Sequence, residues 1–187
     1  MAYIETIDPS AAAGKLADIY HRVRGPGGQV DKVLQVHSLR PHTLEGHMAL
    51  YKAVLHHPGN TLPLWFLEAI GVRVSHLNGC TYCVQHHGRG LKIALGAQGG
   101  PFELYAAQLQ QDEPGRPFTD AEIAALAYAR KLTLTPGAVQ PEDIDALRAR
   151  GFSDGQILEI NQVAGYFAYA NRTVSGLGVT TDGEALG

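Results

Sequence analysis

The 187-residue sequence has no long apolar run, no concentrated basic region and only two cysteines. The first absence argues against a membrane-spanning helix, which needs about 20 consecutive apolar residues. The second, together with a formal net charge of −3, argues against a nucleic-acid-binding protein, because such proteins usually present a basic face. The opening MAYIETIDPS lacks the basic-then-apolar layout of a secretory signal, so we expect a cytoplasmic protein. Because cytoplasmic thiols stay reduced, a purely structural disulfide is disfavoured.

A strand pattern is also missing from the chain. The nearest candidate, TLTPGAV, contains Pro136-Gly137 and is better interpreted as a connector. Apolar residues at helical spacing, prolines at helix starts and capping-box patterns occur throughout instead. We therefore predict an all-α protein with a single domain, residues 1–187, of roughly eight helices. One of these helices should contain the cysteines, and residues 30–38 are a candidate for another. The remaining helices are expected to start at Pro9, Pro41, Pro63, Pro101, Thr119, Gln140 and Ser153.

Both cysteines lie in the stretch LNGCTYCVQHHG, as Cys80 and Cys83. No strand precedes them, which disfavours a thioredoxin fold, and Val84 follows the second cysteine where a c-type haem signature needs histidine. With Asn78 as the expected N-cap, Cys80 lies in the first helical turn, where partial positive charge lowers a thiol pKa. At about 100° per residue, His87 falls between the two cysteines on one face, whereas His86 projects away from Cys80. The spacing suits two thiols that cycle between reduced and oxidised forms.

The preceding segment, LPLWFLEAIGVRVSHL, is apolar nearly all round, with Glu68 among its few polar residues. On a helical wheel Glu68 lies between Leu64 and Val72, about 140° from Arg73, whose face we expect to turn toward water. A carboxylate in apolar surroundings can hold or pass a proton. The alternative is an exposed position at the flank of the helix, and the sequence leaves both open.

Glu68 followed by Cys80-x-x-Cys83-x-x-x-His87 resembles the active-site pattern of the AhpD-like alkylhydroperoxidases, in the carboxymuconolactone decarboxylase superfamily. The segment EAIGVRVSHLNGCTYCVQHH is similar to the core of that family. The resemblance spans most of the chain, because three further segments are similar to the peroxidase-related branch of the family, namely residues 3–25, 33–55 and 151–179.

The resemblance implies an all-helical thiol peroxidase, and we expect a homotrimer or hexamer with no cofactor and no metal. By the same resemblance, Cys83 attacks the O–O bond and becomes a sulfenic acid. Cys80 donates a proton and then resolves the sulfenic acid into a disulfide, while His87 and Glu68 form a proton relay. A hydroperoxide is the implied substrate, and a dithiol, thioredoxin-like or lipoyl reductant restores the thiols.

The chain departs from the family pattern at two places. Tyr82 stands between the cysteines where some members have histidine, and Leu64, Trp65 and Phe66 precede the glutamate where basic residues are common. The first change affects the path of proton transfer in the relay or the acidity of Cys83. The second makes the surroundings of Glu68 more apolar.

Three other functions stay open from the sequence. Cys80, Cys83 and His87 could hold zinc with a fourth ligand from elsewhere, since thiolates and imidazoles suit that ion. A decarboxylase or lactone-processing enzyme of the same superfamily is the second, although that branch does not depend on a cysteine pair. A redox sensor, or a scaffold with a vestigial site, is the third.

The remaining histidines and aromatic residues carry weaker signals. His56 and His57 precede Pro58-Gly59 and are expected to be solvated in a loop. His37, His42 and His47 lie near predicted helix ends or faces, from which one of them could approach the site. The aromatic residues of the last helix are expected to pack a core or a subunit interface, namely Tyr166, Phe167 and Tyr169.

Overall fold

The computed structural model describes residues 2–25 and 27–184 of the chain. Over these residues the fold is all-helical and contains no strand, which confirms the predicted fold class. The described residues form nine α-helices rather than roughly eight: α1 Gly14–Val23, α2 Lys32–Gln35, α3 Pro41–Leu55, α4 Leu64–Leu77, α5 Thr81–Gly96, α6 Phe102–Leu109, α7 Asp120–Leu134, α8 Pro141–Ala149 and α9 Asp154–Gly176.

Local sequence signals set most of these boundaries. Pro41 opens α3, and the expected capping boxes start α7 at Thr119 and α9 at Ser153. The first predicted helix is divided, however. Asp8 caps a short 3-10 helix, Pro9–Ala11, and α1 begins only at Gly14, whose φ of +54° interrupts a continuous helix.

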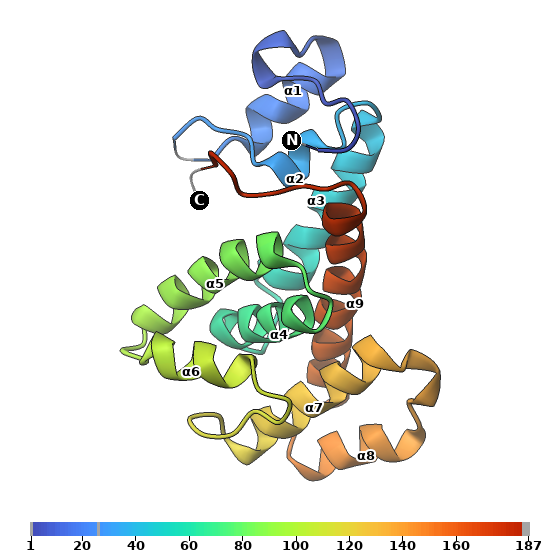
Figure 1. The fold of residues 1–187 in the computed structure, drawn as a ribbon. Helices are drawn as coiled ribbons and strands as arrows, with labels where there is room; N and C mark the ends of the chain where they lie inside the picture. Colours follow the sequence, from blue (N-terminus) through green and yellow to red (C-terminus); the bar gives the residue numbers. More distant parts are fainter. Residues whose placement is uncertain (1, 26, 185–187) are drawn as a thin grey trace.

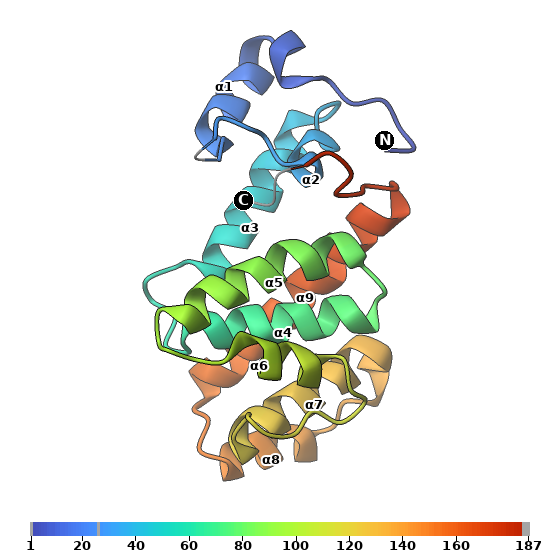
Figure 2. The ribbon, with the colours of Figure 1, turned by 60° about the vertical axis from the view of Figure 1, so that its left-hand side comes forward.

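The long helix α9 runs beside α4, which packs against α5, α7 and α9 (Figure 1). In the turned view, α4 and α5 lie next to each other across α9, with α7 and α8 at one end and α1 to α3 at the other (Figure 2). The buried side of α9 carries the five residues expected from its periodicity: Ile157, Ile160, Ala164, Phe167 and Val174. These contacts make α4 the centre of the main core.

Helix α4 is buried on every face from Trp65 to Ser75, as expected for a helix that is apolar nearly all round. The prediction that Arg73 faces water is wrong, because its side chain is only 2% exposed. Its guanidinium donates hydrogen bonds to the carbonyl oxygens of Leu109 (3.0 Å), Gln111 and Asp112 (2.7 Å). Arg73 is tolerated inside because it satisfies backbone groups at the end of α6.

No helix among the described residues combines the length and apolar character that crossing a membrane requires.

Candidate active site

A cavity of about 480 Å³ opens between α3, α4, α5, α9 and the segment around α2. Much of its wall is apolar, with contributions from Leu34, Met48, Leu64, Ile93, Ala94 and Ala97. Its polar lining includes Asp31, His47, Tyr51, His56, Glu68, Tyr82, Cys83, His86, His87 and Tyr166. Three of the four predicted site residues therefore line one cavity, and the fourth, Cys80, lies directly behind Cys83.

The turn between α4 and α5 places the two cysteines. Asn78 ends α4 instead of capping α5, and Gly79 then adopts a φ of +67° that favours glycine. Cys80 itself is the N-cap of α5, with a non-helical ψ of 86°. The expected position of Cys80 within the first helical turn is therefore wrong by one residue, and Cys83 is the first cysteine inside the helix.

The two thiols are free, buried and in contact, with their sulfur atoms 2.9 Å apart. The hydrogen bond from Cys83, supported by its backbone amide and by Ser175 and Asn171, lowers the pKa of the Cys80 thiol to about 6. The same hydrogen bond, together with burial and the adjacent charge, raises the pKa of Cys83. The directions of these two shifts favour a negative charge on Cys80 over one on Cys83.

Glu68 and His87 form the second element of the site. The Glu68 residue is only 4% exposed, so the alternative of an exposed helix flank is wrong. Its Oε2 lies 2.8 Å from His87 Nδ1, which joins α4 to α5. Gly90 makes this approach possible, since a Cβ there would lie 2.7 Å from Glu68 Oε1. An ionised carboxylate can only accept, so a hydrogen bond from His87 to ionised Glu68 places the proton on Nδ1 and leaves the other ring nitrogen as the base.

His87 does not contact both sulfurs, in contrast to the prediction from the helical wheel. No hydrogen bond joins it to either thiol within the described chain, and the two sulfurs and the imidazole do not form a group within 4.8 Å. The physical reason is the non-helical backbone of Cys80. Its thiol turns toward Asn171 and Ser175 of α9, while the His87 ring turns toward Glu68 and packs edge-on against Phe167 at 4.5 Å.

The carboxymuconolactone decarboxylase family model matches residues 41–131, the segment that holds Glu68, both cysteines and His87. This match, over just under half of the chain, confirms the predicted resemblance to the carboxymuconolactone decarboxylase superfamily. An uncharacterized peroxidase-related protein from Ralstonia eutropha JMP134 with an alkylhydroperoxidase AhpD core has the same fold, with a TM-score of 0.82 and 25% identity. That match covers 96% of this chain and 91% of the other.

Two more solved structures share the fold of this chain. An uncharacterized peroxidase-related protein from Silicibacter sp. TM1040 is 23% identical, with a TM-score of 0.76 and coverage of 95% of this chain and 87% of the other. The debrominase Bmp8 is 21% identical, with a TM-score of 0.72 and coverage of 94% and 89%. A search of curated proteins finds no match to the chain.

Aromatic and imidazole groups that the sequence did not assign to the site complete the cavity. His47 is buried, its Nε2 lies 3.4 Å from the Tyr166 hydroxyl, and burial lowers the pKa of His47 to about 4. Tyr51 shares a 2.8 Å hydrogen bond with His56, which is exposed as expected and also lines the cavity. The spacing of His47 and Tyr51 along α3 was a usable signal, because residues four apart share a helix face.

Tyr82 and His86, whose part in the relay the sequence left open, both contact Glu184, and among the described residues neither has a hydrogen bond to Glu68 or His87. Their rings stack with centroids 4.4 Å apart, and the Tyr82 hydroxyl donates to Glu184 Oε1 at 2.9 Å. Both side chains therefore belong to the entrance of the cavity and not to the proposed proton relay.

Proposed function

We propose that the chain is a thiol-dependent peroxidase that reduces hydroperoxides through a dithiol–disulfide cycle of Cys80 and Cys83. The observation that carries this proposal is the contact of two free thiols, one of them at the wall of a cavity that also holds His87 hydrogen-bonded to the buried Glu68. The match of residues 41–131 to the carboxymuconolactone decarboxylase family and the fold shared with peroxidase-related proteins support it.

Cys83 is the proposed nucleophile because it lines the cavity, whereas Cys80 lies behind it. Before the reaction a negative charge is favoured on Cys80. The proton of Cys83 therefore first moves to Cys80, across the 2.9 Å between the two sulfurs. The Cys83 thiolate then attacks one peroxide oxygen, the O–O bond breaks, and the alkoxide leaves as an alcohol after taking a proton. Cys83 is now a sulfenic acid.

Cys80 completes the oxidative half of the cycle. After losing its proton again, its thiolate attacks the Cys83 sulfur, forming the disulfide and expelling hydroxide, which is protonated to water. Closing the bond requires about 1 Å of movement, because a disulfide is about 2.05 Å long. An external dithiol, of the thioredoxin or lipoyl type, then returns two electrons and two protons to the pair.

His87 and Glu68 are proposed to move the protons. With Nδ1–H held by Glu68, the free ring nitrogen of His87 can accept a proton from a thiol and return it to the leaving oxygen. Because His87 does not touch the sulfurs, the transfer passes through the bound peroxide or one water molecule. The apolar wall favours organic hydroperoxides over hydrogen peroxide.

A cumene hydroperoxide assay with dithiothreitol as reductant tests the proposal. Wild-type protein should turn over, Cys83→Ser should not, and Cys80→Ser should accumulate a sulfenic acid that dimedone traps. Turnover that survives in Cys83→Ser would remove the proposed nucleophile. Oxidation of the wild-type pair without repeated turnover would instead support a redox sensor.

We also propose that the chain assembles as a homotrimer or hexamer. Large apolar side chains remain on the outside of the single chain, among them Ile93 (61% exposed), Leu104 (57%) and Leu158 (59%). Burying such side chains between copies is favourable. Light scattering after size-exclusion chromatography tests this proposal, and a monomer at micromolar concentration would contradict it.

A further inference from the structure

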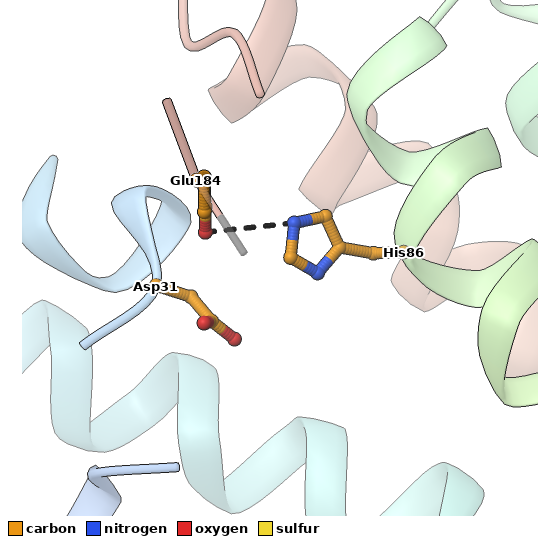
Figure 3. Close-up of side chains that lie close together, drawn as sticks. All are labelled: Asp31, His86 and Glu184. Atoms are coloured by element: carbon orange, nitrogen blue, oxygen red, sulfur yellow. Dashed lines mark ion pairs between the residues drawn. The ribbon is translucent and has the colours of Figure 1, made fainter. Parts of the chain in front are cut away.

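Three polar side chains from distant parts of the chain meet beside the cavity entrance. Asp31 precedes α2, His86 lies on α5 and Glu184 belongs to the segment after α9. One ligand atom from each lies within 4.8 Å of the others, and the side chains point toward a common space (Figure 3). They form the one group of three or more histidine, cysteine or acidic residues with this spacing in residues 2–25 and 27–184.

The group has buried polar atoms without partners. The Glu184 side chain is 5% exposed, its Oε1 receives hydrogen bonds from Tyr82 and from the Lys32 amide, but its Oε2 has no partner within the described structure. His86 Nε2 is likewise buried and lacks a hydrogen bond. Burying such atoms unpaired is unfavourable, so this arrangement indicates a ligand in the space between them.

The negative charge of the two carboxylates also favours the binding of a cation. In the part of the chain that the structure describes, no lysine or arginine forms an ion pair with Asp31 or Glu184. His86 is the one basic side chain that pairs with Glu184, at 3.5 Å between Nε2 and Oε1. That separation is long for a hydrogen bond but close to the edge of a tetrahedron whose metal–ligand bonds are about 2.1 Å.

We propose that Asp31, His86 and Glu184 bind a Zn²⁺ ion at the entrance of the cavity. One imidazole and two carboxylates are ligands that Zn²⁺ accepts, and three protein ligands leave one position for water. Tyr82 supports the site from outside the ligand set, since its ring stacks on His86 and its hydroxyl holds Glu184. This site is separate from Cys80, Cys83 and His87, the residues considered for zinc from the sequence.

The consequence of metal binding is a cross-link between three segments. The ion joins the loop before α2, helix α5 and the segment after α9, and two of its three ligands, Asp31 and His86, line the cavity that contains Cys83. Zinc should therefore stabilise the folded chain and hold the segment after α9 against Asp31 and His86.

Cobalt titration tests the site independently of peroxidase turnover. The Cys80→Ser/Cys83→Ser protein, freed of metal with a chelator, should bind one Co²⁺ per chain, with visible absorption and no thiolate charge-transfer band. Zn²⁺ should displace the cobalt. His86→Asn and Glu184→Gln in the same background should each weaken binding at least tenfold. His57→Asn is the matched control, because His57 is exposed and its Nδ1 contacts only the Gly59 amide.

Two results would overturn the proposal. The first is the absence of saturable Co²⁺ binding in a protein whose circular dichroism shows a helical fold. The second is binding that His86→Asn and Glu184→Gln leave unchanged. As a second measurement on the unmodified cysteine pair, Zn²⁺ should raise the Tm of the oxidised wild-type protein and not that of His86→Asn. An equal rise in both would also contradict the site.

Discussion

Gly90 offers a direct test of the Glu68–His87 pair, because replacing it with alanine changes neither residue. The added Cβ would lie 2.7 Å from Glu68 Oε1 and 3.0 Å from its Cδ. Tight contacts begin near 3.4 Å, so the carboxylate has to retreat by about 0.7 Å. A shift of that size lengthens the 2.8 Å hydrogen bond to His87 or turns the carboxylate away from it.

The expected effect is on catalysis more than on stability. Misplacing a catalytic group by about 1 Å can reduce the rate about 100-fold, so we expect kcat/KM for cumene hydroperoxide to fall about 10- to 100-fold in Gly90→Ala. This corresponds to about 1.4 to 2.7 kcal/mol in the transition state. The intrinsic gain of alanine over glycine in a helix, about 1 kcal/mol, opposes the cost of the close contact.

Gly88→Ala is the matched control in the same helix, since nothing lies within 4 Å of the added Cβ. This variant should keep its activity and gain the full helix propensity of about 1 kcal/mol, which raises Tm by about 2–4 °C in a chain of this size. Equal kcat/KM values for Gly88→Ala and Gly90→Ala would refute the reasoning that the position of Glu68 matters.

Three further predictions concern acidity and packing. Thiolate absorbance should show a first ionisation near pH 6, because the pKa of Cys80 is lowered to about 6. The thiolate should persist above that pH and be lost below it. The absence of thiolate absorbance until pH 9 would contradict this prediction. The pKa of His47 is about 4 when folded and 6.5 when unfolded, so stability is retained above pH 6.5 and falls by up to about 3 kcal/mol as pH decreases through 4. In urea unfolding, the stability of His47→Gln should lose that part of the pH dependence. Identical profiles of stability against pH for wild type and His47→Gln would contradict the prediction. Gly71→Ala places a Cβ 2.2 Å from the Phe167 ring and should lower the free energy of unfolding in urea by about 1–3 kcal/mol. The control Gly165→Ala, whose added Cβ has no neighbour within 4 Å, should not lower it. Similar losses of stability in both variants would show that the ring contact is not the cause.

The parts of the fold that the sequence predicts are those with local signals. Pro41 and the capping residues Thr119 and Ser153 mark helix starts through contacts with residues two to four positions away. The error at Asn78 has the same local origin. The sequence contains a glycine directly after it, and the positive φ of Gly79 ends one helix before Cys80 caps the next.

Burial of single polar residues could not be predicted in the same way. Periodicity placed Glu68 correctly on an apolar face, but its burial depends on the way α5 packs against α4. Arg73 was misjudged because its partners are carbonyl groups 36 to 39 residues further along the chain. Asp31 and Glu184 have no local sequence signal of a binding site, since only the complete fold brings them beside His86.

The position of Cys83 has a kinetic consequence for a peroxidase built this way. One sulfur faces the cavity and the other is hidden behind it, so the oxidant and the electron donor have to enter through the same opening at different times. Such an arrangement predicts ping-pong kinetics, with excess peroxide competing against the donor. Of the two proposed donor types, it also favours a slender lipoyl arm over a thioredoxin, because a broad protein surface reaches a bond inside the cavity less easily.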